Sequence, residues 1–134
     1  MSITTAVCPT LAADAVSALL GDEYKVALIR QGALGDHGDL TQNYSDLGAD
    51  EVKGAGYVAG GQVLKGARLV MRDGRACMDF DPAMWPGGDI HATGALIYSP
   101  TRDGRAVCVL DFGGLYGAGV GELFMLPFDC PVRF

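Results

Sequence analysis

Two apolar runs around a short charged turn constrain the fold of this chain more than any other part of its sequence. Residues 95–98 read Ala-Leu-Ile-Tyr, residues 106–110 read Ala-Val-Cys-Val-Leu, and the segment 100–105 between them contains a proline and a glycine. This pattern predicts two paired strands joined by a turn. A strand with one solvated face alternates apolar and polar residues, and these two runs do not alternate. Both faces of the predicted hairpin therefore need a cover.

The second cover can come from within the chain or from another subunit. A helix and long loops of the same chain could cover the face that the core leaves open. Another copy could cover it in an assembly, because a large exposed apolar patch is unusual on a monomer. We expect an assembly, and we predict Tyr98, Val107 and Val109 as interface residues, with Trp85 and His91 as two further candidates.

Length and composition indicate a single β-rich domain. The 134 residues suffice for one domain with a real core, and a hydrophobic content of 49% argues against disorder. The chain has 20 glycines, whereas average usage predicts roughly nine. Frequent glycine between short apolar runs is typical of many short strands joined by turns. We therefore predict a mainly β fold, an antiparallel β-sandwich or jelly-roll-like barrel of about seven or eight strands.

The expected elements divide this domain, residues 1–134, into a short N-terminal part followed by strands. Residues 1–21 are expected to form an arm with a helix over 9–20. The polar stretch over 31–50 is typical of a flexible or binding loop. Strands are predicted over residues 24–29, 90–99, 105–112, 122–126 and 132–134, with a turn over 81–89 and a loop over 113–121.

The clearest hairpin is centred on Asp73-Gly74. An Asp-Gly pair between apolar runs favours a two-residue turn. With these residues as the loop, Arg68 lies opposite Asp79, and an opposite-charge cross-strand pair supports this register. The same register predicts that Met71 faces the core.

Charge narrows the range of partners. The net charge is −6, the pI is about 4.6 and the basic residues are scattered. Non-specific nucleic-acid binding needs a basic patch, so we expect no nucleic-acid partner. No stretch approaches the roughly 18 apolar residues of a membrane span, so we expect no membrane partner.

The four cysteines are Cys8, Cys77, Cys108 and Cys130, and they show no Cys-x-x-Cys spacing of a zinc site. Cys77 and Cys108 lie inside apolar runs, where a free thiol packs as a small hydrophobe. We expect all four thiols to be reduced, as in a protein made in a reducing cytoplasm.

Two groups of polar residues could carry chemistry. His37 lies beside Asp36 and Asp39, which could share a divalent cation with it, but a solvated loop histidine is the simpler interpretation. Four carboxylates at predicted strand ends could support acid–base chemistry or be structurally paired, and these are Asp79, Asp81, Asp89 and Asp111. Asp111 follows an apolar run, which predicts partial burial with hydrogen-bond donors around it. We expect no catalytic residue, no metal and no cofactor.

Several stretches, taken in order, resemble small structural proteins of tailed bacteriophages. A short helix ending near "ALL" is followed by "YKVALI", "EVKGAGYVAGGQVL" and "MDFDPAMWP". The similarity continues through "ATGALIYSPTRDGRAVCVLDFGG" and "GELFMLPF", and the ending "FDCPVRF" departs from it. The resemblance lies in order and spacing, and no single motif in it carries known chemistry.

This resemblance implies a non-enzymatic virion component, with capsid decoration proteins among its relatives. It implies synthesis in the host cytoplasm, a place on the capsid surface, the major capsid protein as partner, and a homotrimer. The alternative is a head-fibre or tail-associated module that recognises a host-surface glycan, and a hydrolase comes third. Five aromatic residues could supply a glycan platform: Tyr44, Tyr57, Trp85, Tyr98 and Tyr116.

Overall fold

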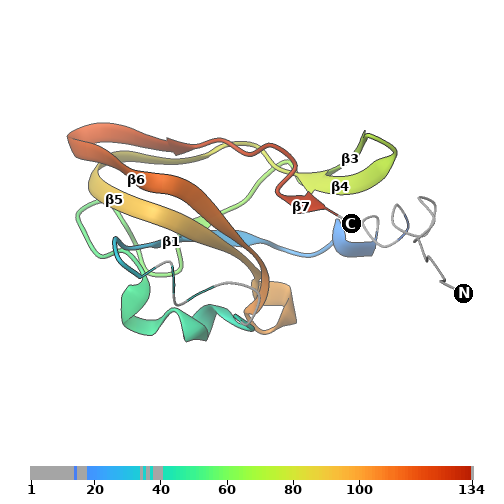
Figure 1. Ribbon diagram of the computed structural model, residues 1–134, viewed down its shortest axis with the longest axis horizontal. Coiled ribbons are helices and arrows are strands. Elements are labelled where there is room, and N and C mark those ends of the chain that lie inside the picture. Colours follow the sequence, from blue (N-terminus) through green and yellow to red (C-terminus); the bar gives the residue numbers. More distant parts are fainter. Residues whose placement is uncertain (1–13, 15–17, 34, 36, 38–40, 134) are drawn as a thin grey trace, which may run out of the picture.

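The computed structural model describes residues 14, 18–33, 35, 37 and 41–133, and most of them lie in antiparallel strands (Figure 1). The strands are β1 (Lys25–Ile29), β2 (Gln62–Val63), β3 (Arg68–Arg72), β4 (Arg75–Asp79), β5 (Ala83–Ser99), β6 (Arg105–Leu126) and β7 (Val132–Arg133). The described connections contain the short 3-10 helices η2 (Tyr44–Asp46), η3 (Gly48–Asp50) and η4 (Pro100–Arg102). The mainly β, antiparallel prediction is confirmed, whereas the helix predicted over 9–20 lies largely outside the described residues.

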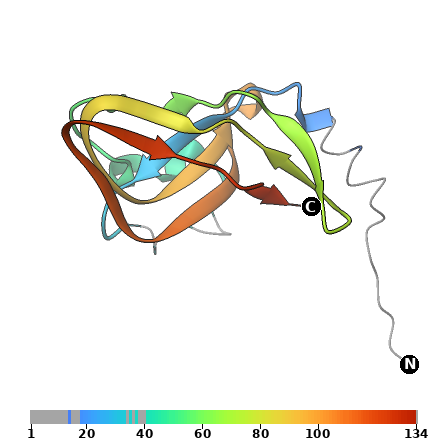
Figure 2. The same cartoon turned by 90° about the horizontal axis from the view of Figure 1, so that it is seen from above.

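The strands form two antiparallel sheets. The larger sheet has the order β2-β1-β5-β6 and the smaller sheet has the order β3-β4-β7. Figure 1 shows the smaller sheet beyond the open end of the long β5–β6 hairpin, and Figure 2 shows β5 and β6 curling back midway along their length. Among the described strands, β2 and β6 lie at opposite edges of the larger sheet and do not pair, so this sheet is open.

The β5–β6 hairpin is longer than the sequence suggests. The turn predicted over 81–89 and the loop predicted over 113–121 are wrong, because both segments lie mainly within these two strands. Register shifts interrupt the pairing on both sides of Gly88, and Gly113 and Gly121 have positive φ values of 76° and 80°. Glycine at such positions lets a strand bulge and continue. The turn-like composition therefore marks bends inside strands.

The β3–β4 hairpin has the register that the sequence predicts. Asp73 and Gly74 form its turn with φ values of 52° and 74°, as a type I′ turn requires. Arg68 lies opposite Asp79, and its guanidinium contacts that carboxylate at 3.3 Å. Met71 is 51% exposed, so the prediction that it faces the core is wrong. The tip of this hairpin extends away from the larger sheet, which therefore cannot cover it (Figure 1).

The two sheets share one main hydrophobic cluster. It includes Val26 and Leu28 of β1, Met78 of β4, Trp85 of β5 and Phe124 of β6, all of which are buried. Removing these apolar side chains from water is the main favourable contribution to folding. One face of the larger sheet is thus covered by the smaller sheet and the segments that join the two.

The opposite face of the larger sheet is covered by the connection between β1 and β2. Leu96 and Tyr98 of β5 pack there against Ala33 and Leu47 in a second buried cluster. Figure 1 shows η2 and η3 lying along this face, beneath β1 and β5. The stretch over 31–50, predicted to be a flexible or binding loop, contributes these covering residues. The non-alternating strands therefore obtain their second cover from within the chain.

Cys77 and Cys130 form a disulfide, which corrects the prediction that all four thiols are reduced. The bond joins β4 to the segment just before β7, across 53 residues of sequence. The cysteine spacing did not predict this bond, because the two residues meet only where β7 pairs with β4. Cys108 is a free thiol that is partly buried, and Cys8 lies outside the described residues.

Asp79 supports the same junction between β4 and the C-terminal segment. Its Oδ1 accepts hydrogen bonds from the backbone N–H groups of Phe80 at 3.0 Å and Cys130 at 3.1 Å. Its Oδ2 accepts one from Arg68, whose guanidinium also contacts Asp81 at 3.1 Å. These two carboxylates, weighed as acid–base candidates, are therefore structurally paired through one arginine.

We predict that alkylation of the unfolded, unreduced protein labels Cys108 and leaves Cys77 and Cys130 unlabelled. Only a thiol, ionised to its thiolate, attacks an alkylating reagent, and a disulfide sulfur does not. Peptide mass spectrometry before and after reduction would measure this. A double variant, Cys77→Ser with Cys130→Ser, should lose roughly 2–4 kcal/mol of unfolding free energy. Labelling of both residues without reductant would show that the disulfide does not form.

Candidate functional site

Glu51 is a buried carboxylate at the centre of a polar cluster. It is 6% exposed, and its backbone forms a bridge with Ile29 of β1. Its Oε1 accepts a hydrogen bond from the Tyr44 hydroxyl at 2.5 Å. Its Oε2 accepts one from the Tyr57 hydroxyl at 2.5 Å and one from the Gly60 N–H at 2.9 Å. A buried charge needs such donors, and here the chain supplies them.

The tyrosines of this cluster connect the covering loop to both central strands. The Tyr57 hydroxyl accepts a hydrogen bond from the Leu28 N–H of β1 at 3.0 Å. The Tyr98 hydroxyl of β5 donates to the Gly60 carbonyl at 2.6 Å, and the Tyr98 ring stacks on Tyr44 with centroids 4.5 Å apart. Segments that are distant in the sequence are thereby held in one unit.

Burial keeps these hydroxyls protonated. It is the main cause that raises the pKa of Tyr44 and of Tyr57 above the ordinary tyrosine value, and the hydrogen bond to Glu51 is the second. Burial also raises the pKa of Tyr98 to about 12, with the charge of Glu51 as the further cause. Sequence reasoning missed Glu51, because a glutamate after a polar loop gives no signal of burial.

The histidine and the last carboxylate singled out by the sequence also have structural partners. The His37 side chain is 5% exposed, and its Nε2 lies 2.8 Å from Asp50 Oδ2, so the solvated-histidine prediction is wrong. The hydrogen bond from His37 is the main cause that holds the pKa of Asp50 below its usual value. Asp36 and Asp39 lie outside the described residues. Asp111 is exposed, contrary to its predicted burial, because β6 is an edge strand.

Trp85 and Tyr98, two of the predicted interface residues, are 1% and 4% exposed. Trp85 packs between Tyr57 and Phe124 in the main cluster, as a core residue. Tyr98 is held by the Glu51 network described above. Neither side chain is on the surface of the chain, and the hydroxyls of Tyr44 and Tyr57 are engaged with Glu51. Of the five aromatic residues considered for a glycan platform, this leaves Tyr116, which is 58% exposed.

Val107 and Val109, also predicted at the interface, lie on opposite faces of β6. Both are partly buried, Val107 against the main cluster and Val109 against the second cluster. A register shift after Ile97 explains why two residues at even spacing do not share a face. Both faces of this part of the hairpin are thus covered within the chain, which removes the reason for placing an interface there.

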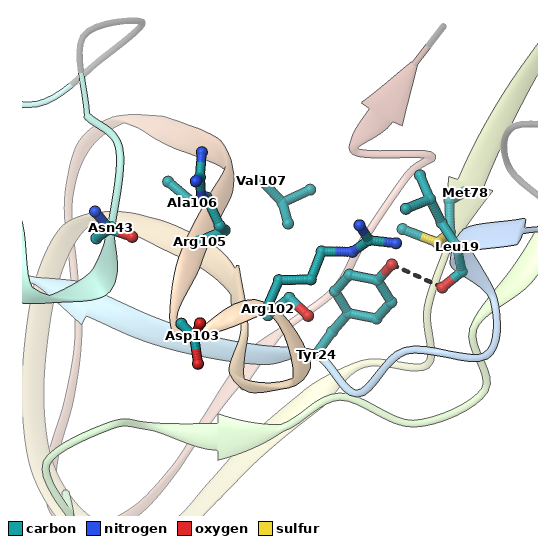
Figure 3. Close-up of a pocket in the computed structure, with 10 residues that line it drawn as sticks. Leu19, Tyr24, Asn43, Met78, Arg102, Asp103, Arg105, Ala106 and Val107 are labelled. Carbon is teal, nitrogen blue, oxygen red and sulfur yellow. Dashed lines mark hydrogen bonds between the residues drawn. The ribbon is translucent and has the colours of Figure 1, made fainter.

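A groove with about 600 Å³ of open space lies between η4, the start of β6 and Tyr24 (Figure 3). Val107 is part of its wall. The Tyr24 hydroxyl donates to the Leu19 carbonyl at 2.7 Å, and Arg102 Nε donates to Asp22 at 2.5 Å. These polar groups already have partners, so the groove is better described as a junction that holds η4 in place.

The far half of the β5–β6 hairpin differs from the covered half. β1 pairs with β5 only from Gly94 to Tyr98, so residues 83–93 of β5 and 112–126 of β6 form a two-strand extension. His91, the fifth predicted interface residue, lies here with a 55% exposed side chain and contacts Asp89 at 2.9 Å.

Buried and exposed positions alternate along the end of β6, and apolar residues occupy the buried positions and the exposed positions alike. Phe124 and Leu126 are buried, whereas Leu123 and Met125 are 52% and 51% exposed. Met84, which lies opposite Met125 in β5, is 49% exposed. A sheet with one solvated face places polar residues at its outward positions. Large apolar side chains at such outward positions are typical of interaction surfaces.

Further apolar side chains are exposed along β6, on both of its faces, because neighbouring residues such as Leu115 and Tyr116 point to opposite sides of a strand. Leu115 and Val120 are 47% and 86% exposed. The rings of Phe112 and Tyr116 meet edge to face with centroids 5.9 Å apart. Together with the end of β6 they line a groove with about 510 Å³ of open space. Sequence reasoning missed this surface because it assigned 113–121 to a loop, although the alternation over 123–126 was readable.

Comparison of the chain with protein-family models, with curated proteins and with solved structures gave no match. Within the described residues, no helix combines the length and the apolar character that crossing a membrane requires.

We predict that Glu51→Gln lowers the unfolding free energy by roughly 2–4 kcal/mol, since hydrogen bonds to a buried charge are worth about 1.5–3 kcal/mol each. The amide NH₂ group cannot accept the bonds that a carboxylate oxygen accepts. Urea unfolding of the variant would measure the loss. Glu23→Gln is the matched control, because Glu23 is exposed. An equal effect of both substitutions would contradict the role assigned to Glu51.

We predict that Tyr98 of the folded protein ionises only near pH 12, well above an ordinary tyrosine. Its pKa is raised from 10.0 to about 12 in the folded state, so the unfolded state loses the proton first. The stability that comes from this shift is complete below pH 10 and is lost as the pH rises toward 12. Tyrosinate absorbance and circular dichroism would be followed together, with Tyr98→Phe isolating the residue's own signal. A Tyr98 tyrosinate signal near pH 10 in a still-folded protein would contradict this.

Proposed function

We propose that this chain is a non-enzymatic structural protein of a bacteriophage particle, a decoration protein that binds the outside of the head and stabilises the shell. The resemblance of its ordered sequence stretches to small phage structural proteins supports this. In this proposal the two sheets are the layers of a β-sandwich domain, the major capsid protein is the partner, and the chain works as a closed oligomer, expected to be a homotrimer.

The apolar outward face of the two-strand extension carries the proposal. Leu123, Met125 and Met84 stand where a solvated sheet has polar residues. A protein that adds contacts between subunits of a shell needs such a face, and it needs no active site. The polar clusters described above stabilise the fold through contacts within the chain. The apolar face is therefore the surface that we assign to binding a partner.

The disulfide adds a condition to this proposal. Disulfides are rare in a reducing cytoplasm, where a phage protein is made. Oxidation of Cys77 and Cys130 would therefore follow release of the particle from its host. The bond would then anchor the C-terminal segment in the mature particle, where no reductant is supplied.

The glycan-binding alternative receives less support. Aromatic rings that bind sugars must present a face to solvent. Trp85 and Tyr98 are buried and Tyr44 and Tyr57 are held by Glu51, so Tyr116 alone of the five candidates is a well-exposed ring.

We predict saturable binding of the purified chain to expanded empty heads of the phage that encodes it, at a fixed number of copies per capsomer. Co-sedimentation would measure the stoichiometry, and antibody labelling in negative stain would locate the chain on the particle. Val58→Glu is the control, because Val58 is 76% exposed and lies outside the extension. Labelling of tails alone, or no binding to heads, would contradict the proposal, and specific binding on a glycan array would favour the alternative.

A further inference from the structure

We infer that the occupant of the two-strand extension is a second copy of this chain, with β6 of one copy packed along its open edge against its neighbour. This inference rests on the proposed function and deepens it, because a decoration protein that acts as a closed oligomer needs a contact between its copies. Three observations carry it: the edges of the two sheets, the backbone of β6 and the charge of the extension.

The sheet edges differ in how they are protected. The two sheets end in β2, β6, β3 and β7. β2 and β7 have two residues each, and β3 begins and ends with the arginines Arg68 and Arg72. Short length and charge are the usual ways in which an edge is kept from pairing with another chain. β6 has 22 residues, and its sequence contains no lysine and no proline. It is the longest edge left able to pair, since the free edge of β5 in the extension carries Pro86 and its Asp89 N–H is already bonded to the Ala55 carbonyl.

The backbone of β6 is covered only at its beginning. Ala106 donates to the Gln42 carbonyl and Gly104 accepts from the Tyr44 N–H, so the covering loop closes this end. Beyond Val107, the described residues show no backbone hydrogen bond from β6 to an element other than β5. Alternate N–H and C=O groups of an edge strand point away from its partner. The outer edge of the extension therefore carries donors and acceptors that another strand can satisfy.

A second copy fits this edge because it presents the same alternation of donors and acceptors and the same apolar side chains. Leu123, Met125 and Met84 on the outward face are each about half exposed, which leaves on the order of 300 Å² of apolar surface, and a stable interface buries about 800 Å² per partner. The strand edge and other exposed residues of β6, such as Leu115, have to supply the remainder. Closed symmetry would keep the contact from propagating into fibres.

Charge also favours self-association at this place. The chain carries a net charge of −6, so two copies repel each other over most of their surfaces. Within the extension, Asp89 and Glu122 are the only acidic residues, and Asp89 is paired with His91 at 2.9 Å. Repulsion between copies is therefore weakest where the apolar side chains and the open edge lie.

Sedimentation equilibrium of the full chain tests this, with a monomer mass of 14.0 kDa as reference. The wild type should sediment as a closed oligomer of two or more copies. Leu123→Glu and, separately, Met84→Lys should raise the dissociation constant about tenfold or more, because each places a charge in the buried contact. Val58→Glu should leave the oligomer unchanged. Circular dichroism on each variant would establish that it is folded.

Hydrogen exchange provides a second readout that needs no variant. Amides of residues 107–126 in the wild type should gain protection as the protein concentration rises through the dissociation constant. A wild type that is monomeric at all concentrations, or an oligomer whose β6 amides gain no protection, would overturn the inference. So would folded Leu123→Glu and Met84→Lys variants that associate as the wild type does.

The inference and the proposed function fail separately. Head binding by a monomeric wild type would overturn the inference and leave the proposed function standing. An oligomer assembled through β6 that does not bind heads would do the reverse.

Discussion

The carboxylate of Glu51 accepts hydrogen bonds from Tyr44, Tyr57 and the Gly60 amide at the point where the covering loop meets the larger sheet. The second hydrophobic cluster depends on this contact, because Tyr44 and Tyr98 reach that face as part of the same network. Backbone hydrogen bonds, such as those from the Val52 N–H to the Leu28 carbonyl and from the Ala106 N–H to the Gln42 carbonyl, also attach the loop to the strands, and Glu51 adds the side-chain attachment between them. A Glu51 carboxylate buried here without hydrogen-bond donors would also destabilise the folded state by itself.

The elements that cover the second face of the larger sheet extend along only part of β5. This extent determines which part of the sheet keeps an exposed apolar face. β1 pairs with β5 only as far as Gly94, and the β1–β2 connection meets β5 once more where the Asp89 N–H donates to the Ala55 carbonyl at 2.9 Å, whereas β5 and β6 continue as two strands. A two-stranded ribbon is marginal alone, and the extension is held by its inner face through Trp85 and Phe124. Its outer face has no such cover within the described chain. The surface that carries the proposed function is thus a consequence of how far the covering elements extend.

The junction between the extension and the smaller sheet is fixed by covalent and ionic contacts. The Cys77–Cys130 disulfide and the Asp79 carboxylate together attach the C-terminal segment to β4. These contacts lie in the smaller sheet, next to the open end of the extension, because only residues 80–82 join β4 to β5 and only residues 127–131 join β6 to β7 (Figure 1). The disulfide and the Asp79 contacts therefore support the end of the extension at which Met84 and Met125 pair.

The sequence by itself determined the features that depend on neighbouring residues. The Asp73-Gly74 turn, the register of β3 with β4, the strand at Lys25–Ile29 and the need for a second cover all follow from local propensity and pattern. The tertiary structure decided what depends on distant residues: which element supplies the cover, where Glu51 finds its donors, which cysteines pair, and that Gly113 and Gly121 bend a strand without ending it. It also decided that Trp85 and Tyr98 lie inside and that the apolar surface is at Leu123 and Met125. The physical reason is that burial is a property of the assembled layers, because an apolar side chain is covered or exposed according to how far its neighbours in space extend.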